Sequence, residues 1–177
     1  MNSILKPTPP YPSFYQAYLD KVPDDGNLLQ HLQTIIIETE ELVKTLSPEQ
    51  LTYRYDTGKW DIKDILLHLA DCERVIIYRA MRIARGDKTN LPAFDENLFV
   101  LNANADNRST ESLLSELRTF RNASIHFIHT LTDESLDRPG TANNYPLTAR
   151  LLVNHLYGHH KHHLLIIKEK YLAMNKM

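Results

Sequence analysis

The sequence predicts an all-α protein, a four-helix bundle, and three observations support this fold class. Apolar residues recur at spacings of three and four along most of the chain, as on the buried face of a helix. Glycine is scarce, with five in 177 residues, and we find no clear signal for a two-residue hairpin turn. One connection, between the second and third long helices, is long, and four long helices with such a crossover are typical of a bundle.

The first segment of the chain is predicted to be an arm rather than part of the bundle. Residues 1–24 contain the stretch KPTPPYP, which we expect to be extended because proline fixes φ and lacks an amide donor. A short helix is expected near residues 14–19. The bundle itself is expected to occupy residues 25–177.

The first long helix is expected to begin near Asp25. An apolar stripe predicts its buried face: Leu28, Leu32, Ile35, Ile36 and Leu42. The stretch SPEQL then predicts a short helical turn. Ser47 can cap this turn, Pro48 suits its first position, and Gln50 can complete a capping box.

The second long helix is expected to run from about Asp61 to Arg85, and Gly86 should end it. Its predicted buried stripe has five members: Ile62, Ile65, Leu69, Cys72 and Ile76. The long connection that follows is expected to carry one short helix after Asp95.

The third helix is expected over about residues 110–131 and the last over about residues 147–173, with a loop containing two prolines between them. A short internal repeat accompanies these elements, since TLSPEQL at 45–51 resembles TLTDESL at 130–136. Each copy precedes a His-Leu pair by some 20 residues, at His68 and at His155. The repeat suggests two helix pairs that are built alike.

Composition excludes several classes of function. A net charge of −2 without a basic cluster argues against nucleic-acid binding, and no apolar run of about 18 residues is present to span a membrane. The single cysteine, Cys72, permits neither an internal disulfide nor a cysteine zinc cluster. The N-terminal residues lack the pattern of a secretion signal, so we expect a cytoplasmic protein.

The stretch NHLYGHHKHHLLII, residues 154–167, holds five of the nine histidines. On a helix, His155, His159 and His163 lie on one stripe, because positions four apart differ by only about 40° around the axis. His162 should lie at the edge of this stripe. His160 is rotated by about 100° from His159, so we expect it to face solvent.

Two imidazoles at positions i and i+4 can bind one divalent metal if a third ligand comes from elsewhere. His68 is the best candidate, because it lies among leucines in the second helix, where an unpaired imidazole would be costly. Asp71, three residues further on, can orient a ligand or hold a metal-bound water. Three protein ligands leave a position open, as in catalytic metal sites.

Other side chains compete for these roles. His126 and His129 lack an acidic neighbour, and we interpret them as core or rim residues, whereas His31 is expected at the surface or its boundary. Cys72 lies one turn after His68 on an apolar face. We interpret it as a core residue that could also serve as an extra ligand.

Two motifs resemble those of the DinB-like family of four-helix metal proteins. The first is GKWDIKDILLHLADCERVIIYR, with Trp60 opening the helix and a histidine-leucine-x-aspartate sequence at His68–Asp71. The second, about 90 residues later, is GHHKHH, in which His159 is followed by the pair His162–His163. The resemblance extends from about residue 25 to residue 171 and leaves the arm outside.

The resemblance implies an up-down-down-up topology and a three-histidine site, with zinc or nickel as the metal. The implied ligands are His68, His159 and His163. The internal repeat would instead favour His155 with His159. If the family pattern holds, His155 lies one turn below the metal, as a residue of the pocket, and His162 lies beside the site.

The resemblance also implies a metal-dependent enzyme, either a hydrolase or a transferase that uses small thiols. An open three-histidine site can polarise a carbonyl or lower the pKa of a bound water or thiol. Asp71 could act as a base or orient a ligand, and three polar residues of the crossover could line the pocket mouth: Asp95, Glu96 and Asn97. Arg79 and Arg82 could hold an anionic small-molecule substrate or could pair with surface carboxylates.

A second hypothesis is a non-catalytic, metal-stabilised module that acts in a stress response or in binding. The sequence does not name a substrate. Bundles of this family often pair, and nine tyrosines leave aromatic side chains for an interface, so we expect a homodimer.

Overall fold

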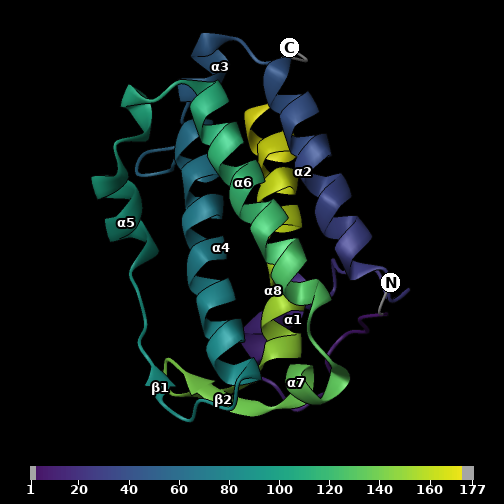
Figure 1. Cartoon of the computed structure of the whole chain (residues 1–177). Helices are drawn as coiled ribbons and strands as arrows, with labels where there is room; N and C mark the ends of the chain where they lie inside the picture. The colour runs from purple at the N-terminus through teal and green to yellow at the C-terminus, as the bar shows by residue number, and fades with distance from the viewer. Residues whose placement is uncertain (1–2, 173–177) are drawn as a thin grey trace.

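Four long helices form the bundle of this computed structural model, which describes residues 3–172. They are α2 (Leu28–Lys44), α4 (Ile62–Ala84), α6 (Thr110–His129) and α8 (Ala149–Ile166). As Figure 1 shows, α2 and α8 run in one direction and α4 and α6 in the other. The predicted four-helix bundle and its up-down-down-up topology are therefore confirmed.

The helices pack in a ring rather than in chain order. α4 packs against α6 and α8, and α2 packs against the same two helices, so α2 and α4 lie at opposite corners (Figure 1). The connection between them is bridged by a short helix, α3 (Pro48–Thr52). No helix in residues 3–172 is long and apolar enough to cross a membrane.

Local signals set the start of α3 and both ends of α4. Asp61 caps α4 by accepting a hydrogen bond from the Asp64 amide at 2.9 Å, and the Asp64 side chain completes the capping box. Ser47 and Gln50 form the expected capping box of α3. Gly86 follows α4 with φ of +83°, a left-handed conformation that ends a helix at little cost in glycine.

The long crossover runs along the outside of the bundle. It contains strand β1 (Asn90–Leu91), helix α5 (Glu96–Ala103) and the 3₁₀ turn η2 (Ala105–Asn107). Asp95 caps α5 by accepting hydrogen bonds from the amides of Asn97 and Leu98, both at 3.0 Å. The short helix expected after Asp95 is thus present, and it lies on the outer side of α4 without a buried residue of its own (Figure 1).

A small sheet corrects the expectation of a loop before the last helix. Strands β2 (Pro139–Ala142) and β3 (Tyr145–Thr148) pair antiparallel, and β1 pairs parallel with β2. Asn143 and Asn144 join the hairpin with φ of 50° and 63°, the two left-handed positions of a type I′ turn. A two-residue hairpin is thus present although the sequence showed no clear signal for one, and the last helix begins at residue 149 instead of 147.

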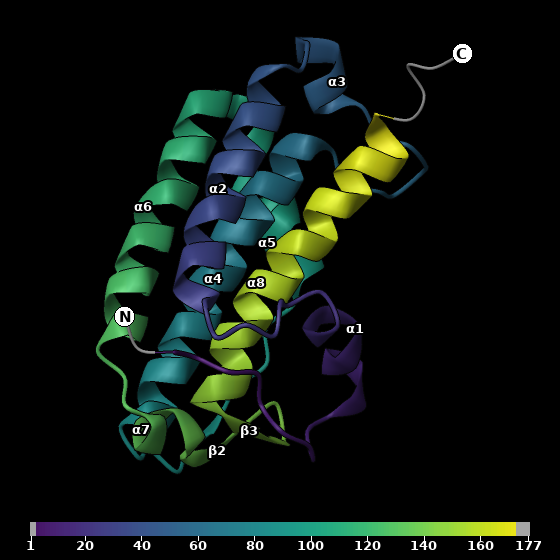
Figure 2. The same ribbon diagram turned by 90° about the vertical axis from the view of Figure 1, so that its right-hand side faces the viewer.

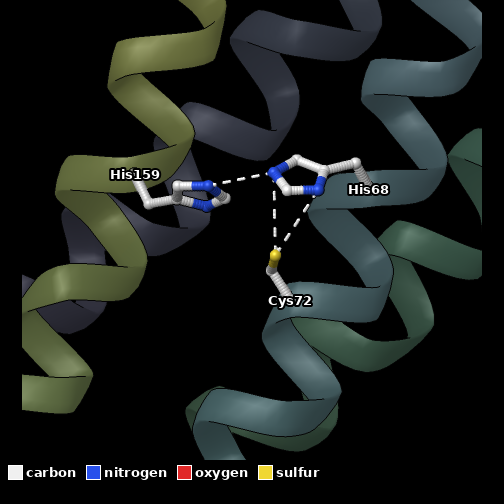
Figure 3. Close-up of side chains that lie close together, drawn as sticks. All are labelled: His68, Cys72 and His159. Atoms are coloured by element: carbon white, nitrogen blue, oxygen red, sulfur yellow. Dashed lines mark hydrogen bonds between the residues drawn. The ribbon is translucent and has the colours of Figure 1, made fainter. Parts of the chain in front are cut away.

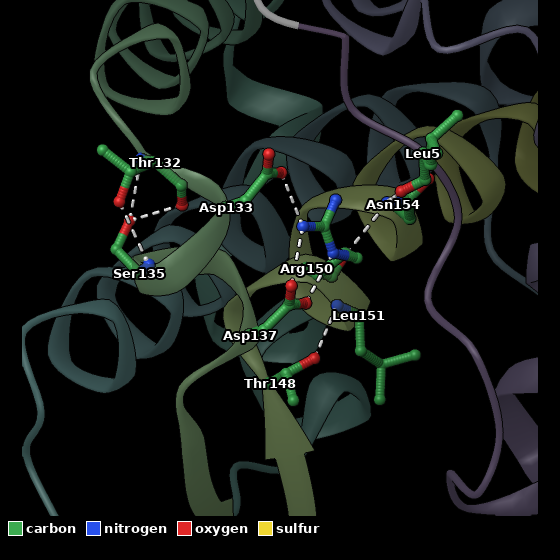
Figure 4. Close-up of polar contacts among 9 residues, drawn as sticks. All are labelled: Leu5, Thr132, Asp133, Ser135, Asp137, Thr148, Arg150, Leu151 and Asn154. Carbon is green, nitrogen blue, oxygen red and sulfur yellow. Dashed lines mark hydrogen bonds and ion pairs between the residues drawn. The ribbon is translucent and has the colours of Figure 1, made fainter.

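Both copies of the internal repeat form a short helix with a capping box. The second copy is α7 (Asp133–Asp137), which Thr132 caps as Ser47 caps α3. Figure 4 shows Asp133 and Asp137 on α7 holding the Arg150 guanidinium at the start of α8, with nitrogen–oxygen distances of 2.6–2.9 Å. Thr148 then caps α8. The repeat therefore marks the entry to each of the two helices that carry the histidine motifs.

The N-terminal arm packs against the bundle. It contains η1 (Ser13–Tyr15) and α1 (Gln16–Leu19), and α1 lies beside α8 (Figure 2). The Ile4 amide donates to the Gly26 carbonyl at 2.9 Å, and the Ile4 side chain is buried. Gly158 of α8 permits the close approach of α1, because a Cβ there would lie 2.2 Å from the Tyr18 carbonyl oxygen.

The end of the last helix differs slightly from the prediction. α8 ends at Ile166 and continues as a π-helical turn, η3 (Ile167–Tyr171). The predicted end at residue 173 lies outside the described residues. The apolar stripes predicted for the first two long helices are buried, except that Leu42 is half-buried.

A buried polar network joins all four long helices. The Arg121 guanidinium on α6 pairs with Glu73 on α4, with the shortest nitrogen–oxygen distance 2.9 Å. It also donates to the Leu32 carbonyl of α2 at 2.9 Å and to Nδ1 of His160 on α8 at 3.2 Å. Nε2 of His160 lies 2.8 Å from the hydroxyl of Thr39 on α2.

The network corrects the prediction that His160 faces solvent. This side chain is 1% exposed. Because Arg121 donates to Nδ1 and the Thr39 hydroxyl already donates to the Ile35 carbonyl at 2.8 Å, Nε2 of His160 carries the proton. Burial holds the pKa of His160 well below its ordinary value, so the ring is neutral.

We expect Arg121→Met to lower the free energy of unfolding by about 3–5 kcal/mol, because the change leaves the Glu73 carboxylate buried without its partner. Lys168→Met is the matched control, since it removes the same charge from an exposed ion pair with Glu38 and should cost no more than about 1 kcal/mol. Urea unfolding followed by circular dichroism measures both. The double variant Glu73→Met, Arg121→Met should recover much of the loss, and a single Arg121→Met variant as stable as the control would contradict this account.

Candidate metal site

Three imidazoles converge between α4 and α8. Nε2 of His159 lies 3.1 Å from Nε2 of His68 and 3.2 Å from Nε2 of His163. The ring centres of His68 and His163 are 4.8 Å apart. Figure 3 shows His68 and His159 pointing toward each other across the two helices. The structure thus brings together the three histidines that the sequence predicts as ligands.

The helices place these rings through packing on both sides. Trp60, directly before the α4 cap, lies with its ring centre 4.5 Å from that of His68 and 6.3 Å from that of His163. Tyr18 of the arm lies against His159, with 5.8 Å between ring centres. Aromatic walls therefore limit how the rings of the cluster can turn.

The distances from Nε2 of His159 to its two neighbours fit a metal ion. In a tetrahedral site with metal–nitrogen bonds of about 2.0–2.1 Å, the ligand nitrogens lie about 3.3 Å apart. The two Nε2 distances at His159, 3.1 and 3.2 Å, are close to that value. Two neutral imidazole nitrogens at this distance can form only one hydrogen bond between them, so a cation would satisfy all three rings better than the rings satisfy one another.

Cys72 lies beside the same cluster, one turn after His68 (Figure 3). Its Sγ is 3.6 Å from both ring nitrogens of His68, and His68, Cys72 and His159 could together hold a metal ion. Burial raises the pKa of the Cys72 thiol to about 12, so the metal-free protein holds it protonated. The sequence interpretation of Cys72 as a core residue agrees with its 5% exposure.

A cavity of about 360 Å³ opens onto the cluster. Besides the three histidines and Cys72, its lining includes His155, His162 and Arg79, three residues that the sequence predicts beside the site or in its pocket. The size is within the range of small-molecule sites. α1, α4, α8, the crossover and the β2–β3 hairpin all contribute to the wall, so the arm is part of the pocket.

His155 lies one turn below His159, between two tyrosines. Its ring centre is 4.9 Å from that of Tyr15 and 4.8 Å from that of Tyr18, in edge-on contacts. Nδ1 of His155 is buried and has no hydrogen-bond partner among residues 3–172. Nε2 of His159 lies 3.2 Å from Nε2 of His163, whereas the ring centres of His155 and His159 are 5.4 Å apart.

The acidic candidates occupy different places. Asp71 does not line the cavity, and its carboxylate instead accepts a hydrogen bond from Arg74 at 2.7 Å. Asp95 caps α5 and also lies outside the lining. Glu96, the next residue, does line the cavity from its crossover side, and Asn97 lines two neighbouring depressions.

The remaining candidates are separate from this cavity. His31 is partly exposed and pairs with Asp25 at 2.9 Å, as expected of a boundary residue. His126 and His129 are exposed and line a groove between α2 and α6. Arg82 pairs with Asp87, which is the surface pairing that the sequence left open for it.

Burial keeps the clustered rings neutral. It lowers the pKa of His68 to about 4 and that of His163 to about 3, and it holds the pKa of His159 well below the ordinary value. Neighbouring imidazoles reinforce the shifts of His159 and His163, since two positive rings would repel. The donor set is therefore ready to bind a metal at neutral pH without losing protons.

The comparison with known families identifies the class of the protein. Residues 31–167 match the model of the DinB superfamily, which covers most of the chain, and the chain belongs to this superfamily. The match begins after the arm and ends where α8 gives way to the π-helical turn. The family resemblance found in the sequence motifs is confirmed.

Individual relatives agree with this class. A protein of Oceanobacillus iheyensis, named provisionally as a metal-dependent hydrolase, is 27% identical over 149 residues, which cover 83% of this chain and 85% of the relative. The solved structure of YfiT from Bacillus subtilis, described as a probable metal-dependent hydrolase with an unusual four-helix bundle topology, has a TM-score of 0.75. It is 20% identical, and the match covers 98% of this chain and 97% of YfiT. A DinB-like protein, YjoA, also from Bacillus subtilis, matches at a TM-score of 0.59 and 19% identity over 85% of this chain and 92% of its own. At these identities the two structures establish the fold.

We expect the stability of the metal-free protein to fall as the pH drops from about 6.5 toward 4. A histidine whose pKa is lowered by folding contributes stability above its unfolded pKa, and this contribution is lost as the pH falls through the folded value. For His68, with a folded pKa of about 4, the full contribution is on the order of 3 kcal/mol. Denaturant unfolding at a series of pH values in a chelator measures it.

The control compares two substitutions. His68→Gln should flatten the slope of stability against pH in this window, whereas His126→Gln, at an exposed position, should leave the slope unchanged. Identical slopes for wild type and His68→Gln would show that burial does not keep this ring neutral.

Proposed function

We propose that the protein is a metal-dependent hydrolase that binds a divalent ion, zinc or nickel, with His68, His159 and His163. The observation that carries the proposal is that Nε2 of His159 lies 3.1 Å from that of His68 and 3.2 Å from that of His163, at the wall of a cavity of small-molecule size. The name of the Oceanobacillus relative supports the same class of activity.

Three histidines rather than a cysteine-containing set make the better ligands. The rings are already neutral, whereas Cys72 would have to lose a proton whose pKa burial raises to about 12. A set with Cys72 as the fourth ligand would also close the tetrahedron, which is the pattern of structural sites. With Cys72 left as a thiol, the three histidines would hold the ion and leave one coordination position for water or substrate from the cavity that they line.

The open position determines the chemistry. A divalent ion held by three neutral imidazoles supplies a Lewis acid that polarises a carbonyl and lowers the pKa of a water molecule. The residues of the chain do the rest: Trp60 and Tyr18 exclude bulk water from the rings, and the cavity holds the substrate beside them.

We assign the proton-transfer role to Glu96. It is the carboxylate in the lining of the cavity, whereas Asp71 is paired with Arg74 outside it. Asp71 instead braces the Arg74 side chain, which also pairs with Glu116 of α6 and so ties α4 to α6 near the site.

Metal content tests the ligand set. Purified His68→Ala, His159→Ala and His163→Ala should each lose most of the bound zinc or nickel, because two imidazoles alone hold a divalent ion weakly. His126→Ala is the matched control and should keep it, as should Cys72→Ser. Metal analysis of the purified variants decides the question. If Cys72→Ser lost its metal and His163→Ala retained it, the ligands would be His68, Cys72 and His159 instead of the three histidines.

Turnover on a panel of amide, ester and thiol-conjugation substrates tests the activity. Glu96→Gln should reduce hydrolysis by about 10²-fold or more at unchanged metal content, as expected for loss of a general base, whereas Asp71→Asn should have a much smaller effect. Turnover confined to thiol conjugation would make the protein a transferase. Metal-loaded wild type that turns over none of these substrates would favour a non-catalytic role.

A further inference from the structure

Arg79 differs from the other buried arginines in having no carboxylate partner. Arg121 pairs with Glu73, and Arg150 pairs with Asp133 and Asp137. Arg79 is 9% exposed, and among residues 3–172 it forms no ion pair within 4 Å. Buried guanidinium groups are normally paired, because desolvating an uncompensated charge is costly.

The contacts of Arg79 within the protein leave most of its donors free. Nη2 donates to the Pro92 carbonyl oxygen, and the guanidinium carbon lies 5.5 Å from the ring centre of Phe94. A guanidinium has five N–H donors. The remaining donors have no hydrogen-bond partner among the described residues, yet they are not sealed off, because Arg79 lines the cavity of the histidine cluster.

Helical geometry places Arg79 and His68 at two ends of that cavity. They are eleven residues apart on α4, which is about three turns, so both lie on one face with a rise of about 16 Å between their Cα atoms. Cys72 and Ile76 occupy the turns between them and also line the cavity. Side chains on a helix lean toward its N-terminus, which tilts Arg79 toward the cluster.

The charges around the cavity leave Arg79 uncompensated. The lining contains no other lysine or arginine among the described residues, and its imidazoles are held neutral by burial. Glu96 is the acidic residue of the lining, and its carboxylate forms no ion pair with Arg79 within 4 Å. Tyr15 is a neighbour with 7% exposure. Burial raises its pKa, and the positive charge of Arg79 lowers it in part.

We propose that Arg79 binds the carboxylate of a small-molecule substrate whose reacting group lies at the histidine cluster. The inference rests on the proposed hydrolase site and adds the class of substrate. A planar guanidinium can donate two parallel hydrogen bonds to a carboxylate. The ligand would then supply the negative charge that no protein carboxylate provides to Arg79 among residues 3–172.

Because Arg79 is a single cation, this end of the cavity favours a carboxylate over a phosphate. A carboxylate carries a single charge, whereas a phosphate group carries between −1.5 and −2 at neutral pH and would remain uncompensated beside a single arginine. Phe94 lies against Arg79, and the lining of the cavity also includes the apolar residues Ile76 and Leu147. The substrate is therefore an amide or ester of modest size that carries a carboxylate at the end remote from the bond to be cleaved.

Binding of benzoate and of benzamide, an uncharged molecule of nearly the same shape, tests the proposal without relying on turnover. Titration calorimetry or ligand-observed NMR at pH 7.5 is carried out on metal-loaded and metal-free protein. Wild type should bind benzoate at least tenfold more tightly than benzamide in both forms. Arg79→Met should weaken benzoate at least tenfold and leave benzamide unchanged.

Arg82→Met is the matched control, because Arg82 lies on the same helix but pairs with Asp87 outside the cavity. It should bind benzoate as wild type does. Should Arg79→Met not fold, Arg79→Lys keeps the charge without the planar fork, and its preference for benzoate over benzamide should fall but persist. Unchanged metal content in the Arg79 variants confirms that the histidine cluster is intact.

Each other outcome overturns the inference. If wild type and Arg79→Met bound benzoate equally well, Arg79 would hold no carboxylate. The same conclusion would follow if removal of the metal abolished benzoate binding while the Arg79 substitution did not. If phenyl phosphate bound to metal-free wild type more than tenfold more tightly than benzoate, the site would be a phosphate site and not a carboxylate site. Failure of the hydrolase proposal looks different, since benzoate would still bind through Arg79 while no substrate in the panel turned over.

Discussion

The rest of the structure depends on the hydrogen bonds of the Arg121 guanidinium. This group extends from α6, contacts the other three long helices, and belongs to a residue with 2% exposure. It pairs with Glu73 of α4, donates to the Leu32 carbonyl of α2, and donates to His160 of α8. A shift of α8 by one residue would turn it by about 100° and break the contact with His160. Buried polar groups of this kind specify one arrangement among several of similar apolar burial, even where their net contribution to stability is small.

The same constraint positions the histidine cluster. His159 precedes His160 in the chain, so fixing the rotation of α8 at His160 also fixes the direction in which His159 and His163 point. α4 is held at Glu73, five residues after His68, by the same guanidinium. On the last helix, His160 therefore fixes the packing of the bundle, whereas His159 and His163 face α4 and are available for a ligand.

Much of the fold followed from local sequence signals. Apolar spacing predicted the four long helices, the Ser47–Gln50 capping box predicted the short helix α3, and Gly86 predicted the end of α4. The Asn143–Asn144 hairpin was not predicted because its turn contains no glycine, although asparagine also adopts the left-handed positions that a type I′ turn requires.

The site was predicted in outline but not in its surroundings. The four-residue spacing put His159 and His163 on one face, and burial among leucines marked His68. The placement of His160 failed because its partners, Thr39 and Arg121, are 121 and 39 residues away, and no local periodicity reports such contacts. The contribution of the arm was also hidden, although the glycine at 158, beside the histidines, is the residue that lets Tyr18 approach.

The cavity combines two features that the bundle alone would not require. At one end the imidazoles present neutral donors, and at the other Arg79 presents a cation without a carboxylate partner among residues 3–172. Apolar and aromatic walls separate the two ends. A protein that needed only stability would fill this space with packed side chains, so the arrangement is best explained by a ligand that spans it.

X-ray absorption spectroscopy of the zinc-loaded protein tests the central claim most directly, because it distinguishes nitrogen from sulfur neighbours of the metal. The account predicts three imidazole ligands with zinc–nitrogen distances of about 2.0–2.1 Å and no sulfur neighbour, which leaves one position for a light atom from solvent or substrate. A sulfur neighbour at about 2.3 Å would place Cys72 in the coordination sphere and contradict the open three-histidine site.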